Sequence, residues 1–273
     1  SPGLVGSEMC IRDRIIDEIS MVSLALCAVL EQLHSCGTRI IATGDFSQLP
    51  PVGNSWRGTP VAPDVLKDSA LLWRWSEGTH FVLTRCRRSD AAHFKFYMTL
   101  PQSVKAAVAK VRAQYPTSNE ADLHLTISHR RRRAINSMQQ LRFTGAHGVE
   151  VPEHDGEPSY WAAAGTPIVG SCTGRAFVNG AFYSIQSVSG NSDGWKVRVQ
   201  DTLTEQVLEV TPETLSKHTC LAHAIVYNRA QGATVRDKTI ACHDLDSKWF
   251  SRAHLYVGLS RVTDGGSIRI ARP

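Results

Sequence analysis

Two adjacent carboxylates follow a short apolar run near the start of the sequence. Ile15 and Ile16 precede Asp17 and Glu18, so the pattern predicts a strand that ends in an acidic loop. In that arrangement one carboxylate can hold Mg²⁺ while the other orients a water molecule for phosphoryl transfer. An acidic pair after a strand is also common as a solvated turn, so the pair alone leaves both interpretations open.

A second polar loop follows the next β-branched run. Residues 39–43 predict a strand, which Gly44 and Asp45 close. Pro50 and Pro51 then exclude both a helix and a central strand, because proline fixes φ and lacks an N–H donor. Gln48 therefore lies in a loop, at the tip of the same predicted sheet as the acidic pair.

Basic side chains are concentrated at two places in a chain of net charge +5. Arg85, Arg87 and Arg88 form one cluster, and residues 130–133 are four consecutive arginines. A fixed guanidinium can meet the charge that develops on γ-phosphoryl oxygens. An arginine run that opens a helix can contact the phosphates of a single strand, although a solvated helix face explains any one of the four equally well.

The elements that must position these residues alternate between helices and strands. Apolar periodicity predicts helices over residues 21–33, 70–75 and 134–141, and strands over residues 39–43, 81–84, 122–128, 222–227, 238–242 and 267–270. This alternation predicts an α/β fold with mainly parallel sheets covered on both faces, and with functional residues at the carboxyl ends of the strands.

The pattern changes to short β runs and Gly-containing turns between residues 165 and 210, which predicts a small antiparallel insertion in the second α/β domain. Residues 1–14 predict no element and lack the apolar core of a secretory signal. The expected organisation is an uninterpretable segment (1–14), the end of a first domain (15–84), the first part of a second domain (85–180), the insertion (181–215) and the last part of the second domain (216–273).

Composition excludes several classes of protein. With 42% hydrophobic and 20% charged residues the chain is in the globular range, and no apolar run approaches the ~20 residues that span a bilayer. Seven cysteines without a Cys-x-x-Cys pair argue against a disulfide framework or zinc ribbon and favour a reducing compartment. His223, His243 and His254 lack metal-ligand spacing and are interpreted as structural, whereas tryptophans such as Trp73 and Trp161 could stack bases or fill a core.

The two polar loops together resemble motifs II and III of the Pif-type DNA helicases, which are superfamily 1 motors related to RecD. Further segments resemble the family's motifs in the family's order. They are Leu83-Thr84-Arg85-Cys86-Arg87-Arg88 for motif IV, Ser128-His129 to Ile135-Asn136 for the next strand-helix element, Gln231-Gly232-Ala233-Thr234 for motif V and Tyr256-Val257-Gly258-Leu259-Ser260-Arg261-Val262 for motif VI. The resemblance covers essentially everything from Ile15 onward. It implies RecA-like P-loop domains, the first one incomplete, with a small β-barrel inserted in the second.

The resemblance also implies roles for individual residues. Asp17 would hold Mg²⁺ through water, Glu18 would polarise the attacking water, and Gln48 would sense the γ-phosphate of ATP. Arg88, or Arg87 in the neighbouring register, and Arg261 would be the cations of the second domain. The remaining implied binding residues are Gln231 and Gly232 for the nucleotide, and His129, Arg130, Arg131 and Arg229 for nucleic acid.

Two departures from the family pattern affect these expectations. Asn228-Arg229-Ala230-Gln231-Gly232 stands where the family has His-Lys-Ser-Gln-Gly, so a serine hydroxyl is lost. No G-x-x-x-x-G-K-[ST] motif occurs, and no glycine is followed by lysine. A truncated reading frame and a degenerate, non-hydrolysing protein both explain the missing phosphate loop, and in either case the chain alone is expected not to hydrolyse ATP.

The resemblance implies the C-terminal portion of an ATP-dependent DNA helicase that moves five-prime to three-prime on single-stranded DNA and unwinds duplex junctions. Its cofactors would be ATP and Mg²⁺, and the protein would be monomeric and would not bind a membrane. Its setting would be DNA repair, recombination or telomere maintenance in the nucleus, a mitochondrion, or the cytoplasm of a bacterial or infected cell. The alternatives are a non-hydrolysing nucleic-acid-binding remnant and the helicase part of a conjugative relaxase.

Overall fold

The computed structural model describes residues 13–272, except residues 63, 144, 175 and 192–193. The expectation for residues 1–14 therefore falls almost wholly outside the described part. The chain divides between Arg85 and Cys86 into two compact units, which are described separately below.

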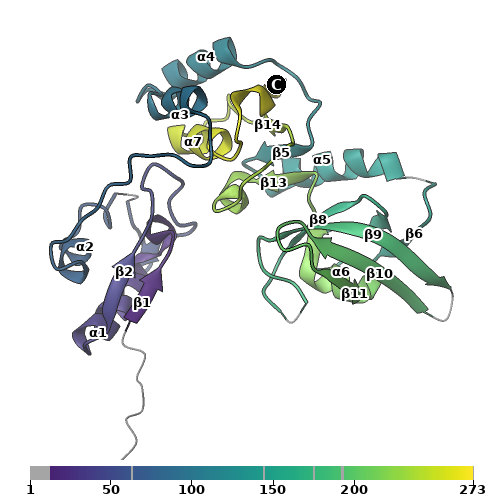
Figure 1. Cartoon of the computed structure of the whole chain (residues 1–273), viewed down its shortest axis with the longest axis horizontal. Helices are drawn as coiled ribbons and strands as arrows, with labels where there is room; N and C mark the ends of the chain where they lie inside the picture. Colours follow the sequence, from purple (N-terminus) through teal and green to yellow (C-terminus); the bar gives the residue numbers. More distant parts are fainter. Residues whose placement is uncertain (1–12, 63, 144, 175, 192–193, 273) are drawn as a thin grey trace, which may run out of the picture. The chain divides into compact units, whose positions relative to one another are not determined.

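Unit 1 is built on two parallel strands (Figure 1). Strand β1 (Asp13–Ile16) pairs with β2 (Arg39–Ala42), so that Ile15 lies opposite Ile41. Helix α1 (Leu24–Ser35) connects them after the short turn η1 (Ile19–Met21). Helix α1 begins three residues later than expected because the side chain of Ser23 caps it, accepting a hydrogen bond from Leu26 N at 3.3 Å.

The remaining elements of unit 1 close its core. A two-stranded hairpin joins β3 (Ser55–Trp56) to β4 (Thr59–Pro60), and helix α2 (Ala70–Trp75) matches its predicted bounds. The core residues are Ile19, Cys27, Leu30, Ile40, Leu66 and Trp75. Trp75 is buried and donates its indole N–H to Glu31 Oε2 at 2.7 Å, whereas Trp73 is exposed.

The strand predicted over residues 81–84 is wrong. Phe81, Val82 and Leu83 are exposed by 82%, 76% and 93%, and the segment is neither strand nor helix. Within the described part of unit 1 no strand pairs with it, so its backbone groups have no ladder to join. The β-branched and aromatic composition that suggested a strand is not sufficient without that partner.

Unit 2 contains a four-stranded parallel sheet in the order β13-β5-β14-β15 (Figure 1). These strands are β5 (Leu123–Thr126), β13 (Ala224–Val226), β14 (Ile240–Cys242) and β15 (Ile268–Ile270). Every residue of β5 is buried, as expected for a central parallel strand covered on both faces. The predicted α/β class with a parallel sheet is confirmed.

Four helices belong to this sheet region. They are α3 (Ala91–Met98), α4 (Val104–Gln114), α5 (His129–Gln140) and α7 (Arg252–Leu259), with the short turns η2 (Leu141–Phe143), η3 (Tyr227–Ala230) and η4 (Gly265–Ser267). Helices α3, α4 and α7 gather together, and α5 packs on β5 and β13 (Figure 1). Helix α5 begins five residues before the predicted start because Ser128 caps it, accepting from Arg131 N at 3.2 Å.

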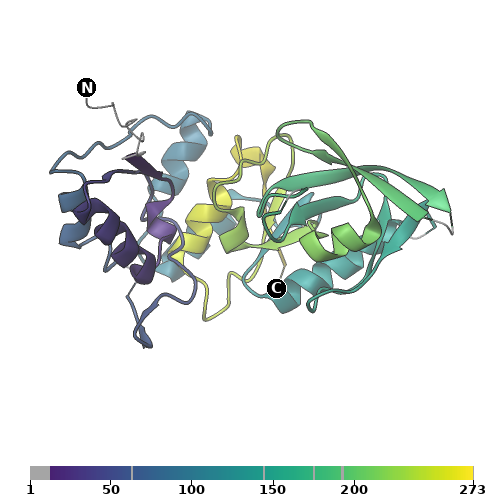
Figure 2. The ribbon, with the colours of Figure 1, turned by 90° about the horizontal axis from the view of Figure 1, so that it is seen from below.

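The antiparallel part of unit 2 is larger than the expected insertion over residues 181–215. Its five-stranded sheet has the order β11-β10-β9-β8-β12, from β8 (Pro167–Gly170), β9 (Phe182–Asn191), β10 (Gly194–Asp201) and β11 (Val207–Val210) to β12 (Thr219–Leu221). A hairpin of β6 (Gly148–Val151) and β7 (Tyr160–Ala163) packs on the same core, and helix α6 (Pro212–His218) precedes β12 (Figure 2). No helix in the described part of the chain is both long and apolar enough to cross a membrane.

We expect Asn136→Ala to lower the free energy of unfolding of unit 2 by about 2 to 4 kcal/mol, because it leaves several buried polar groups without a hydrogen-bond partner. The Asn136 side chain donates to Leu221 O and Ala224 O, both at 3.1 Å, and accepts from Ala224 N at 2.7 Å. Urea unfolding followed by circular dichroism measures the loss. The exposed neighbour variant Ser137→Ala should change it by less than ~0.5 kcal/mol. Equal effects of the two substitutions would contradict this role of Asn136.

Candidate functional site

The acidic loop of unit 1 is tied to the end of the neighbouring strand. Asp17 Oδ1 accepts from Thr43 Oγ1 at 2.5 Å and from Glu18 N at 2.9 Å. Ile19 N donates to Thr43 O at 2.8 Å, so the loop after β1 remains attached to the residue that follows β2. The carboxyl ends of the two strands thus meet at one edge, where Asp17 and Glu18 were predicted to lie.

Two backbone features allow this close meeting of loops. Glu18 has φ 53°, a left-handed conformation that costs energy for a residue with a Cβ. A Cβ on Gly44 would lie 2.9 Å from Ile19 N and 3.2 Å from Ser20 N, so a larger residue would push the loops apart. Thr43 and Gly44 were not assigned roles in this contact from sequence, although their position at a strand end is the signal that could have indicated it.

Gln48 lies on the loop that leaves β2. Gln48 N donates to Asp45 O at 3.1 Å and Ser47 N donates to Asp45 Oδ1 at 2.8 Å, which defines a tight turn, while Leu49 beside it is 3% exposed. Gln48 Oε1 is buried, with no hydrogen-bond partner among the described residues. A buried acceptor without a donor is costly, so this oxygen is suited to a ligand that supplies one.

The segments that carry the two predicted cations of unit 2, Arg88 and Arg261, are joined to each other by hydrogen bonds. Arg88 Nη1 donates to Ser260 O at 3.2 Å, and Asp90 N donates to Thr263 O at 2.9 Å, which ties residues 88–90 to the end of α7. Arg87 is exposed and Arg88 is half-buried.

Arg261 is only 2% exposed and is held by main-chain oxygens. Its Nε donates to Val257 O at 3.2 Å, and its Nη1 donates to Ala230 O and Ala233 O, both at 3.3 Å. Those two carbonyls bracket Gln231 and Gly232, the predicted nucleotide-binding residues. The structure therefore brings Arg261 and the 230–233 loop together and makes the arginine a support of that loop, while its role toward a nucleotide stays a prediction.

Gly232 has φ +76°, and an added Cβ there would meet nothing within 4 Å. The glycine is thus required by the backbone conformation of the loop and not by crowding. Gln231 N donates weakly to Asn228 O at 3.4 Å, and Ala233 N to Ala230 O at 3.2 Å, which keeps the turn compact.

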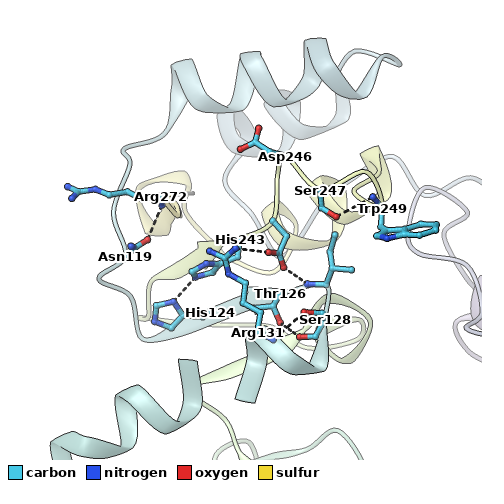
Figure 3. Close-up of polar contacts among 12 residues, drawn as sticks. Asn119, His124, Thr126, Ser128, Arg131, His243, Asp246, Ser247, Trp249 and Arg272 are labelled. Carbon is cyan, nitrogen blue, oxygen red and sulfur yellow. Dashed lines mark hydrogen bonds and ion pairs between the residues drawn. The ribbon is translucent and has the colours of Figure 1, made fainter. Parts of the chain in front are cut away.

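The four consecutive arginines have different environments. Arg130 is exposed, whereas Arg131 pairs with Asp244, whose Oδ1 lies 3.0 Å from Arg131 Nη1 and whose Oδ2 accepts from Ile127 N at 2.8 Å (Figure 3). Arg132 is 2% exposed and forms an ion pair with Glu157. Arg133 is half-buried, with its Nη2 3.6 Å from Glu157 Oε1. Phosphate contact and a solvated helix face were the two open interpretations of this run, and Arg130 is the exposed one of its four arginines.

Arg229, which was also a predicted nucleic-acid contact, lies beside a thiol. Arg229 Nη1 is 3.1 Å from Cys220 Sγ, and Arg132 Nη1 approaches the same sulfur at 3.5 Å. His129 lies near these cations, and burial followed by the charge of Arg132 lowers its pKa. No local pattern indicated the Cys220 contacts, because its partners are 88 and nine residues away in the chain.

A group of buried histidines lies behind the start of α5. His124 Nδ1 is 2.9 Å from His243 Nε2, and Arg131 lies beside the pair (Figure 3). Burial, with the neighbouring His124, lowers the pKa of His243 to about 3, and burial with Arg142 lowers that of His223 to about 4. Among the described residues no group of three or more histidine, cysteine or acidic side chains is placed to hold a metal ion.

Searches with protein-family models and among curated proteins return no match for the sequence. Solved structures do match. A Pif1 helicase from Candida albicans aligns with a TM-score of 0.67 and 16% identity, over 96% of this chain and 72% of that one. Bacteroides Pif1 bound to ssDNA aligns with a TM-score of 0.62 and 18% identity, over 95% of this chain and 70% of that one. Bacteroides Pif1 in complex with ADP-AlF3 and ssDNA aligns with a TM-score of 0.61 and 16% identity, over 94% of this chain and 69% of that one.

These alignments cover both units of the chain and show its fold. The chain shares the fold of these Pif1 helicase structures, which is the fold that the motif resemblance implied. At this level of identity the comparison assigns architecture, and the chemistry must be argued from the residues.

We expect stability to fall as pH drops from about 6.5 toward 4, because the unfolded chain binds protons that buried, neutral His243 and His223 do not. The pKa values of both histidines are lower in the folded than in the unfolded chain. Their contribution to the free energy of unfolding is therefore complete above the unfolded pKa and is lost as the pH falls below it. His243→Gln should flatten the curve by at most about 1.4 kcal/mol per pH unit. Urea midpoints measured across this range test the expectation, with exposed His154→Gln as the control. An unchanged slope in His243→Gln would contradict it.

Proposed function

We propose that this chain is the C-terminal portion of an ATP-dependent DNA helicase that translocates on single-stranded DNA, five-prime to three-prime, and separates duplex junctions. The observation that carries the proposal is the meeting of Asp17, Thr43 and the Gln48 loop at one edge of a parallel pair, in a chain with a Pif1-like fold. Relatives crystallised with ssDNA and with ADP-AlF3 support both ligands.

The residues of unit 1 fit the terminal phosphate and metal of a nucleotide. Asp17 would hold Mg²⁺ through water, because a carboxylate oxygen is the ligand type that this ion takes. Bound Mg²⁺ and ATP supply the phosphoryl group and neutralise charge that develops on it. Gln48 fits a phosphate-sensing role because its buried Oε1 lacks a donor, which a lytic water would supply.

Glu18 would orient that water. Its left-handed backbone follows directly on Asp17, so the two adjacent carboxylates have different surroundings. In the proposal Glu18 accepts the proton of the attacking water, and half-buried Arg88 supplies positive charge to the phosphoryl oxygens. Arg261 supports the 230–233 loop, and its role toward the nucleotide stays a prediction. The phosphate-cradling motif is not in this sequence, so hydrolysis would require that loop from sequence upstream of Ile15.

Single-stranded DNA would bind unit 2 through its accessible cations. We expect Arg130→Gln to weaken binding of an unstructured oligonucleotide and to reduce the slope of log K against log salt by roughly 0.7, since one fewer counterion is released. Fluorescence anisotropy over a salt series measures both. The control, Lys105→Gln, removes an exposed charge from α4 and should leave the slope unchanged. A salt-independent affinity of the parent chain would contradict phosphate contacts altogether.

The role of Arg261 is testable in a protein that joins residues 15–273 to the upstream sequence of its gene. Arg261→Lys should lower DNA-stimulated ATP turnover by ~10³ or more, because lysine keeps the charge and loses the planar set of donors. The exposed Arg236→Lys should remain active.

The affinity for single-stranded DNA shows whether an Arg261 variant loses turnover through the nucleotide or through weaker DNA binding. If Arg261 acts on the nucleotide, the affinity for DNA should stay within about threefold of the parent, a change below ~0.7 kcal/mol. Retention of more than about a tenth of turnover, a loss under ~1.4 kcal/mol, would rule out the assignment.

A further inference from the structure

A thiol and an imidazole lie together in the antiparallel part of unit 2. Cys172 Sγ is 2.9 Å from His218 Nδ1, and both residues are half-buried. Cys172 follows β8 by two residues, and His218 is the last residue of α6. The two are 46 positions apart, so the sheet topology and not local sequence creates the contact.

Main-chain bonds on both sides fix this pair. Ser171 N, directly before the thiol, donates to His218 O at 2.8 Å. Gly174 N donates to Phe177 O at 2.8 Å and turns the chain back after the thiol. An added Cβ on Gly174 would already touch the His218 ring at 3.7 Å, so the loop closes around the imidazole. These main-chain hydrogen bonds therefore hold Cys172 Sγ close to His218 Nδ1.

The arrangement is that of a nucleophile with its base. A thiol reacts as the thiolate, and a neighbouring imidazole that takes its proton promotes that form. With Nδ1 as the acceptor, the neutral ring carries its proton on Nε2, and transfer from Sγ gives a thiolate beside an imidazolium.

The other described cysteines lack this combination. Cys27 and Cys242 are buried, and burial raises the pKa of both thiols, that of Cys242 to about 12. Cys220 is 3% exposed, which hinders access by a reagent. Cys86 Sγ accepts a hydrogen bond from Ser89 N at 3.3 Å and lies 3.7 Å from Tyr97 Oη, and no imidazole among the described residues is hydrogen-bonded to it.

We propose that Cys172 and His218 form a reversible thiol-modification site that takes low-molecular-weight disulfides of the glutathione class. The proton of Cys172 moves to His218 Nδ1, and Sγ attacks one sulfur of the disulfide. A new S–S bond forms to Cys172 while the disulfide bond of the reagent breaks. The departing thiolate takes the proton from His218. Cys172 is thereby oxidised to a mixed disulfide with one half of the reagent, and the other half leaves as a reduced thiol.

The test follows modification of each cysteine in the whole chain by peptide mass spectrometry, with oxidised glutathione and, separately, iodoacetamide. Cys172 should react with both reagents about tenfold faster than exposed Cys36 at neutral pH, because its thiolate is assisted. His218→Asn should slow Cys172 about tenfold and leave Cys36 unchanged. Lys217→Gln is the matched control, since it removes the adjacent charge and keeps the imidazole.

A pH series separates chemical assistance from simple packing. An unassisted thiol loses about tenfold in reactive thiolate for each pH unit below ~8.5. The rate at Cys172 should fall less steeply in the parent chain and should take on that tenfold dependence in His218→Asn. Equal rates at Cys172 and Cys36, or a His218→Asn variant of unchanged rate and circular dichroism, would overturn the proposal. An equal slowing by Lys217→Gln would overturn the role of the imidazole.

Discussion

Unit 2 depends on a guanidinium that is buried among backbone carbonyls. Burial of a charge is expensive unless every donor is satisfied. Arg261 donates to the main-chain oxygens of Val257, Ala230 and Ala233, and to Ser260 Oγ at 2.7 Å. Since Val257 is on α7 and the alanines flank the 231–232 turn, one side chain fixes the distance between a helix and a loop. Neither lysine nor an apolar residue can replace that set of bonds.

The corresponding constraint in unit 1 is steric as well as polar. The bond from Thr43 Oγ1 to Asp17 holds two strand ends together, and the absence of a side chain at Gly44 lets Ile19 reach them. Both effects act at the edge where the acidic pair leaves the sheet. The geometry of the carboxylates is therefore set by residues that themselves carry no chemistry, and its precision depends on the loop conformation at Glu18.

Sequence periodicity was sufficient to predict those helices and strands whose packing partners lie within the described part of the chain. The buried strand β5 and helix α2 were predicted from apolar spacing because burial and local propensity agree there. Residues 81–84 have the same composition as a strand and form none, since pairing is a property of the neighbour. The starts of α1 and α5 were missed for a local reason, because capping by Ser23 and Ser128 outweighs the apolar pattern.

The candidate site was predictable in residue identity but not in the environment of each residue. The run 130–133 reads as four equal charges, yet its members are an exposed side chain, a partner of Asp244, and a buried and a half-buried partner of Glu157. Those acidic partners are 113 and 25 positions away, so no local window contains them.

The difference between these arginines also has a physical reason. Positive charge in the first turn of a helix opposes the macrodipole. Carboxylates from outside the helix offset that cost for Arg131 and Arg132, whereas Arg130 keeps its charge in solvent. An arginine that stabilises the fold must be paired, and one that binds a phosphate must be accessible. Burial therefore separates architecture from recognition within a single turn of helix.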